Sequence, residues 1–356
     1  MPFLGWTLPG VVTAGAAQIL AQAEAILPGE RILVAGSGPF LFAVAATLVK
    51  ATLQCDAQVV TVLQAPFSLH RAGRGMALLR GQGSRLIEGL AYARELAFAR
   101  TPIYVGWGIS EVSGGEKVEQ AILTRLDSKW QPKPGRKRVI PVDTVVVGYG
   151  LLPNNHLGRM LGCRHYFDSH SGAWLPLRDD TFQTSLPGVY IVGDAAEING
   201  AEAARLEGRL AGLAVAHRAG YLTDVHAEGQ IVALTHQIDR QHCLGRFMQE
   251  VFSPDIHNMN SLLELAGGQT FACRCEEITI AEIRLAIAAG ASSPAEIKMM
   301  TRSGMGNCQG RICETTINGA LVAAGFGREN ITPEWKGFSI RPPLEPIPVS
   351  VLTQSD

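Results

Sequence analysis

The sequence lacks a net charge of either sign, a long apolar run and a secretory signal, and each absence excludes a class of protein. Lysine and arginine number 31 against 32 acidic residues, a net charge of −1, so no overall field favours nucleic acid. No uninterrupted apolar run approaches the roughly 20 residues that a transmembrane helix needs. The first residues show no basic segment followed by an apolar core and a cleavage site. We therefore expect a cytoplasmic protein, at most peripheral on the inner membrane, with no transmembrane segment and no nucleic-acid partner.

The sequence also lacks the residue patterns of acid–base and nucleophilic catalysis. It shows no Ser/His/Asp constellation, no paired carboxylates and no C-x-x-C redox motif. We therefore predict no catalytic residue in this chain. Its 356 residues allow two or three domains, each with its own core.

Cysteine is sparse except in residues 271–314, which hold four of the seven cysteines. One residue separates Cys273 from Cys275, four separate Cys308 from Cys313, and 32 residues lie between the two pairs. A [2Fe-2S] cluster binds four soft thiolates, two on each iron. Two close pairs of cysteines could supply that set at one point.

Three other uses of these cysteines compete with a cluster. A structural zinc site also takes four cysteines, but its paired ligands usually have about two to four residues between them, and the first pair has only one. Disulfides need an oxidising compartment, which nothing in the sequence signals. Four unrelated buried thiols would leave their concentration in one stretch unexplained.

The segment between the two cysteine pairs is predicted to be helical. Residues 280–287 carry apolar side chains at helical spacing, and Ser293 offers a cap followed by proline at a first turn. Each pair would then lie in a loop that enters a helix. The N–H groups of Gly304, Gly306 and Gly310 would face the sulfur atoms.

The spacing and the sequence TRSGMGNCQGRIC around the second pair resemble the [2Fe-2S] domain of bacterioferritin-associated ferredoxin. The match covers residues 271 to about 326. The resemblance implies the following cluster ligands: Cys273, Cys275, Cys308 and Cys313.

A βαβ unit is predicted from residue 30 onward. An apolar strand leads through a turn with Gly36 and Gly38 into an apolar helix and a second strand at 58–63. The turn is similar to the dinucleotide fingerprint, in which glycines let a pyrophosphate lie at a helix N-terminus. However, Leu41 replaces its third glycine, and Gln64 stands where an acidic residue would bind the ribose. Gly36 and Gly38 are therefore candidate cofactor-binding residues of a scaffold on which NAD is not expected.

Two further apolar segments, at 143–154 and 188–196, predict a pair of strands, the second followed by a helix from about Gly200. A strand that ends in Gly193 and Asp194 would place a carboxylate and free N–H groups at the edge of an α/β sheet. Such groups can bind the ribityl hydroxyls and phosphate of a flavin nucleotide. The alternative is a plain strand-to-helix crossover that Asp194 caps.

These segments resemble the two-dinucleotide-domain flavoproteins of the disulfide-reductase type, in which an FAD domain is split around a nicotinamide domain. The resemblance implies an α/β fold that lacks the N-terminal FAD βαβ unit, followed by a small helical [2Fe-2S] domain. It also implies FAD or FMN, held by this chain or shared with a partner subunit, and a Met1 that is internal to a longer ancestral chain. The expected domains are 1–27, a remnant helix of the FAD domain without an opening strand; 28–142, a Rossmann-like NAD-type domain; 143–225, the C-terminal half of the FAD domain; 226–268, linker helices; 269–326, the [2Fe-2S] domain; and 327–356, a proline-rich tail laid as an arm on another surface.

The order of these parts, the opening GWTLPGVVTAGAAQ and the tail IRPPLEPIPVSVL resemble the alpha subunits of bacterial heteromeric amino-acid and amine dehydrogenases, the opine oxidase and hydrogen cyanide synthase type. The resemblance implies an oxidoreductase subunit for CH–NH or CH–NH2 donors that transfers electrons from an FAD-bearing, amine-oxidase-like partner. A small ferredoxin-like subunit is a further expected partner. Two alternatives stay open: an NAD(P)H-dependent ferredoxin-type reductase, and a non-catalytic scaffold or iron–sulfur binding module.

Overall fold

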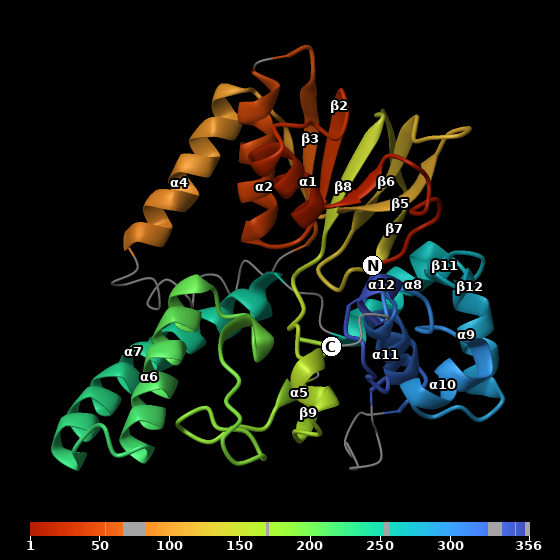
Figure 1. Ribbon diagram of the computed structural model, residues 1–356. Coiled ribbons are helices and arrows are strands. Elements are labelled where there is room, and N and C mark those ends of the chain that lie inside the picture. Colours follow the sequence, from red (N-terminus) through yellow and green to blue (C-terminus); the bar gives the residue numbers. More distant parts are fainter. Residues whose placement is uncertain are drawn as a thin grey trace. The chain divides into compact units, whose positions relative to one another are not determined.

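The structure is a computed structural model that describes residues 1–53, 55–66, 83–168, 171–252, 256–326, 337–345 and 347–352 (Figure 1). Its contacts divide the chain into two compact units. The first comprises residues 1–151, 243–272 and 279–281, and the second comprises 152–242, 273–278 and 282–356. Within the described residues, no helix combines the length and the apolarity needed to span a bilayer.

A five-stranded parallel sheet forms the centre of the first unit, in the order β1-β8-β2-β3-β4. Its strands are β1 (Val11–Thr13), β2 (Arg31–Gly36), β3 (Gln58–Gln64), β4 (Ile103–Val105) and β8 (Thr144–Gly148). The middle strand β2 is apolar along its length because both of its faces are covered. Ile32 and Val34 point into one core, and Leu33 and Ala35 point into the other.

Helices cover one face of this sheet and an antiparallel sheet covers the other (Figure 1). The helices are α1 (Ala14–Ala23), α2 (Pro39–Thr52) and α4 (Gly83–Phe98), and the second sheet consists of β5 (Trp107–Ser113), β6 (Gln120–Leu126) and β7 (Pro132–Pro141). Leu41 and Leu48 of α2 pack against Ile32, and Leu123 of β6 packs in the core of Leu33. The predicted βαβ unit is therefore confirmed as β2-α2-β3.

Two expectations for this unit are wrong. The sequence predicts no strand in residues 1–27, but β1 pairs in parallel with β8. Three residues are too few to show a period, so the strand had no visible signal. The sequence also assigns residues 143–148 to the FAD domain, whereas β8 pairs with both β1 and β2, and the first unit continues to Leu151. An apolar run predicts a strand but not the sheet that the strand joins.

The second unit begins with α5 (His156–Met160) and a hairpin of β9 (His165–Asp168) and β10 (Ala173–Pro176). A short 3-10 turn, η1 (Gly193–Ala195), precedes α6 (Ala201–Arg218). Helix α6 packs on α7 (Asp224–Phe252) through an apolar core that includes Leu206, Leu210, Leu234 and Ile238.

The C-terminal part of the chain consists of short helices and turns. Its elements are α8 (Ile256–Ala266), β11 (Phe271–Cys273), β12 (Ile278–Thr279), α9 (Ile280–Ala288), α10 (Pro294–Thr301), α11 (Glu314–Ala323) and α12 (Val349–Leu352). The helices predicted at 280–287 and after Ser293 are confirmed. The Ser293 hydroxyl accepts the N–H of Glu296 at 3.3 Å and the Glu296 carboxylate accepts the N–H of Ser293 at 3.1 Å, a capping box that fixes the start of α10.

Candidate metal centre and nucleotide sites

Four cysteines of the second unit lie at the ends of these short elements. Cys273 ends β11, Cys275 follows in the next turn, Cys308 lies in the loop after α10, and Cys313 is the N-cap of α11. Cys273 and Cys313 are each 1% exposed, whereas Cys308 is half-buried and Cys275 is exposed. One side of the group is therefore buried and the other reaches the surface.

The four thiols approach one another as two pairs. Cys273 is hydrogen-bonded to Cys313, and Cys275 to Cys308. The bond from Cys313 outweighs burial and lowers the pKa of Cys273 to about 5, with help from the backbone N–H of Gly304. The same bond, together with burial, raises the pKa of Cys313. At Cys275 the N–H of Cys308 lowers the pKa, but burial and the Cys308 thiol raise it further, so the net shift is upward.

This donor set fits a [2Fe-2S] cluster. In the described part of the chain, no three His, Cys, Asp or Glu side chains are grouped to hold one metal ion. The four thiols are soft ligands of the kind that a two-iron cluster binds, and they approach one another as two pairs. The N–H of Gly304 points at the sulfur of Cys273, as predicted, and such donors stabilise an anionic cluster.

Gly306 lets the loop of Cys308 approach Cys275 closely. A Cβ atom added at Gly306 would overlap the Cβ of Cys275 and lie 3.3 Å from its sulfur. No other residue type fits this position without moving one of the two cysteine loops.

Gly36 and Gly38, the candidates in the first unit, differ in what surrounds them. A Cβ at Gly36 would overlap the carbonyl oxygen of Gly148, so this glycine is required for the approach of β8. Gly38 begins α2 with φ +100° and has open space where its Cβ would lie. The neighbouring Ser37 hydroxyl donates to the carbonyl oxygen of Phe252, within the same unit. Leu41 is 1% exposed and packs in the core, which explains the departure from the fingerprint.

Gly193 and Asp194 lie in η1, not at the end of a strand as predicted. Among the described residues, the segment 188–196 forms only an isolated bridge, between Tyr190 and Gln183. A Cβ at Gly193 would lie 2.8 Å from that of Ala204 on α6, so the glycine allows the turn to pack on the helix. The side chain of Asp194 is exposed.

Glu207 on α6 holds this turn, and sequence reasoning missed it. Its carboxylate is 1% exposed and accepts the N–H of Gly193 at 2.8 Å. It also binds Arg178 at 3.1 Å and His242 at 2.6 Å. Burial raises the pKa of Glu207, but His242, the Gly193 N–H and Arg178 lower it further, so the net shift is downward. The available signal was helical spacing, because residue 207 falls on the face that Leu206 and Leu210 bury.

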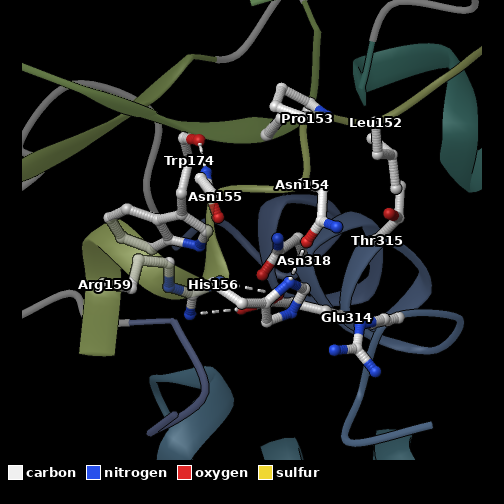
Figure 2. Close-up of a pocket in the computed structure, with 13 residues that line it drawn as sticks. Leu152, Pro153, Asn154, Asn155, His156, Arg159, Trp174, Glu314, Thr315 and Asn318 are labelled. Atoms are coloured by element: carbon white, nitrogen blue, oxygen red, sulfur yellow. Dashed lines mark hydrogen bonds and ion pairs between the residues drawn. The ribbon is translucent and has the colours of Figure 1, made fainter. Parts of the chain in front are cut away.

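A cavity of about 280 Å³ lies within the second unit (Figure 2). Its lining consists of Leu152, Pro153, Asn154, Asn155, His156, Arg159, Gly172, Ala173, Trp174, Arg311, Glu314, Thr315 and Asn318. Helix α11 supplies part of this wall and begins directly after Cys313. The N–H of Asn154, another lining residue, donates to the carbonyl oxygen of Asp194 at 3.1 Å. The cavity is therefore one residue away from Cys313 through Glu314, and one hydrogen bond away from the turn of Asp194 through Asn154.

The polar groups of the cavity are arranged around one ion pair. Arg159 and Glu314 form two bonds of 3.0 and 3.1 Å with little exposure to solvent. The Nδ1 atom of His156 lies 2.9 Å from the Oδ1 atom of Asn154. Burial, and then the charge of Arg311, lower the pKa of His156, which favours the neutral ring. Asn318 is 1% exposed, and its amide oxygen has no hydrogen-bond partner among the described residues.

Comparison with protein families identifies the class. Residues 4–220 match the family model described as pyridine nucleotide-disulphide oxidoreductase. Residues 272–322 match the model of the BFD-like [2Fe-2S] binding domain, which contains all four cysteines. The chain therefore belongs to the pyridine nucleotide-disulphide oxidoreductase family and carries a BFD-like [2Fe-2S] domain, as the sequence predicts.

Individual relatives confirm the narrower resemblance. An opine oxidase subunit of Rhizobium meliloti is 35% identical over 97% of this chain and 71% of its own length. Hydrogen cyanide synthase subunit HcnB of Pseudomonas aeruginosa is 33% identical over 98% of this chain and 72% of its own. Among solved structures, L-proline dehydrogenase from P. horikoshii matches 99% of this chain and 56% of its own, with a TM-score of 0.65 and 18% identity. This last likeness concerns the fold.

Proposed function

We propose that this chain is the electron-transfer subunit of a heteromeric FAD-dependent dehydrogenase for amino acids or amines, with CH–NH or CH–NH2 donors. The proposed ligands of the [2Fe-2S] cluster are Cys273, Cys275, Cys308 and Cys313. The main support is that the four thiols approach one another as two pairs, in a part of the chain whose neighbouring residues Arg311 and Glu314 line the cavity. When bound, a [2Fe-2S] cluster supplies one-electron transfer.

The unequal burial of the cysteines supports a role in transfer to another protein. Cys273 and Cys313 close the inner side of the site, whereas Cys275 stands at the surface. Electron transfer requires a redox centre close to its partner, and the exposed Cys275 side offers that approach. Met305 and Ile312, in the same loop region, are 45% and 49% exposed and would give the docking face an apolar character.

Flavin is the second cofactor that we propose for this chain, as FAD or FMN, held alone or shared with a partner. The cavity fits the polar edge of a flavin ring in its chemistry, because His156 and the buried amide of Asn318 offer hydrogen-bonding atoms beside the Trp174 indole. A cavity of about 280 Å³ admits a ring system but not a whole dinucleotide. Asp194 and Gly193 remain proposed cofactor contacts at its edge.

A heteromeric complex is supported by the relatives, two of which are named as subunits. We propose that the electron donor is an FAD-bearing, amine-oxidase-like protein and that a small ferredoxin-like protein is a further member of the complex. The cytoplasm, or the inner face of the membrane, is the proposed location. The domain boundaries given above stay proposals apart from the corrected placement of β1 and β8.

Co-expression with a candidate amine-oxidase-like partner tests the function. We expect the complex to reduce a one-electron dye at the expense of an amine or amino acid, and Cys275→Ser to abolish dye reduction while the complex still assembles. Cys55→Ser is the matched control, because Cys55 is also exposed but lies in the first unit. Full dye reduction by the Cys275→Ser complex would contradict electron transfer through the cluster and would support a scaffold role for this chain. Rapid reduction of the purified chain by NADH would instead support the reductase alternative.

A further inference from the structure

Residues 337–345, which we call the C-terminal arm, lie against the loop that carries Cys308. The match to the [2Fe-2S] domain family ends at residue 322, so the arm lies outside the part of the chain to which that family model assigns the cluster. Arm and loop both belong to the second unit. The contacts between them are specific and start at Phe338.

The ring of Phe338 fits a space that two glycines of the loop leave open. Phe338 is 2% exposed. A Cβ atom at Gly304 would lie 2.6 Å from the ring, and one at Gly310 would overlap it. Both glycines have positive φ, at +80° and +86°. The ring therefore contacts the backbone of the loop on both sides of Cys308.

The backbone of Phe338 is fixed by the ion pair that lines the cavity. Its N–H donates to Glu314 Oε1 at 2.9 Å, and its carbonyl oxygen accepts from Arg159 Nη2 at 2.7 Å. Glu314 is the residue after Cys313. The nitrogen of Lys298 lies 5.4 Å from the centre of the Phe338 ring, on the side of α10. The arm is thus anchored to α5, α10 and α11.

Two loop side chains bind the rest of the arm. Gln309 donates to the carbonyl oxygen of Pro343 at 2.7 Å. Arg311 donates to the carbonyl oxygen of Leu344 at 2.6 Å and to the carboxylate of Glu345 at 2.9 Å. The loop between α10 and α11 consists of turns without a strand or helix, so the arm contacts add to the turn hydrogen bonds that hold it.

We propose that Phe338 is a positioning residue of the metal centre: with its arm, it holds the loop of Cys308 in the conformation that presents the thiols of Cys308 and Cys313 together. The proposal rests on the cluster assignment above. Without the ring, Gly304 and Gly310 have a cavity beside them and greater backbone freedom, so the loop opens more often. A cluster held by this loop would then lose iron more readily.

The test compares the full chain with Phe338→Ala, Phe338→Leu and the control Ile347→Ala, whose side chain is 42% exposed near the arm. In the iron-free chain, amide hydrogen exchange at residues 304–311 should be about tenfold faster in F338A, because that substitution opens a cavity under the loop. In the anaerobically loaded chain, F338A should release iron to a chelator about tenfold faster and show a broadened electron paramagnetic resonance spectrum after reduction. F338L should give values between those of F338A and the unchanged chain, and I347A should match the unchanged chain.

Exchange and iron release in F338A that equal those of the unchanged chain would overturn the proposal. If F338A does not fold, F338L decides: intermediate exchange supports the proposal and unchanged exchange overturns it. A chain that binds no iron at all would contradict the cluster assignment, while the exchange measurement would still show whether the arm holds the loop.

Discussion

Replacing Glu207 with alanine should destabilise the second unit more than any surface substitution on the same helix. The carboxylate is 1% exposed and compensates Arg178, whose side chain is 12% exposed, as well as the buried N–H of Gly193. Removing one partner of a buried charge pair costs about 3–5 kcal/mol. The N–H of Gly193 would also lose its acceptor, which by itself costs about 1–3 kcal/mol. We do not add this cost, because the N–H group and the charge pair belong to the same network. We therefore expect about 3–5 kcal/mol, or roughly 10 °C in the unfolding temperature of this unit.

Scanning calorimetry of the full chain measures the change, with Glu202→Ala as the matched control. Glu202 lies on the same helix and pairs with Arg205 at 2.6 Å, but both side chains are about half exposed. Such an exposed pair contributes little to stability because solvent screens it. A loss of stability in Glu207→Ala as small as that in Glu202→Ala would show that the buried carboxylate of Glu207 does not stabilise the second unit.

The same carboxylate gives a pH dependence with a defined sign. The net shift lowers the pKa of Glu207 in the folded chain below its ordinary value of 4.5. Its stabilisation is therefore fully present above pH 4.5 and is lost as the pH falls through the lower, folded pKa. The stability difference between the unchanged chain and Glu207→Gln should shrink across that acid range. A difference that stays constant there would show that the charge of Glu207 contributes nothing.

Two further substitutions separate the cofactor sites. Gly306→Ala places a Cβ against that of Cys275, so the chain should fold but retain less than about a tenth of its iron, whereas Gly208→Ala, a helical glycine with open space, should retain all of it. Equal iron in both would show that the two cysteine loops need not approach closely. Asn318→Leu removes the amide oxygen of the cavity that has no partner among the described residues, and should lower flavin content at least several-fold without loss of iron, measured by absorbance after denaturation. Unchanged flavin content in that variant would show that the flavin does not bind in this cavity.

The features that the sequence predicted correctly all carry a local signal. The strand of Ile32 is apolar at every position after Arg31, and Ser293 combines a cap, a proline and a glutamate within four residues. The four cysteines of residues 271–314 also stand out because cysteine is rare elsewhere, and their role as cluster ligands stays a prediction. In each case the residues that define the feature are neighbours in the chain, so no knowledge of the fold was needed.

The missed features depend on partners that are distant in sequence. The N–H of Gly193 donates to the carboxylate of Glu207, fourteen positions later, and no local pattern predicts that bond. Phe338 lies 28 positions after Gly310, whose missing side chain makes room for its ring. The proline content predicts an extended tail at 327–356, but it does not predict which surface the C-terminal arm covers. No local sequence pattern distinguishes one apolar docking site from another.

Iron and acid-labile sulfide analysis of the anaerobically purified chain measures whether the cluster is present. We expect about two iron atoms and about two sulfides per chain, with a rhombic electron paramagnetic resonance signal after reduction. Cys275→Ser should remove most of that signal, and Cys55→Ser should leave it intact. A colourless protein that carries zinc, or a Cys275→Ser variant with full iron and an unchanged spectrum, would contradict the claim that the two cysteine pairs bind a [2Fe-2S] cluster.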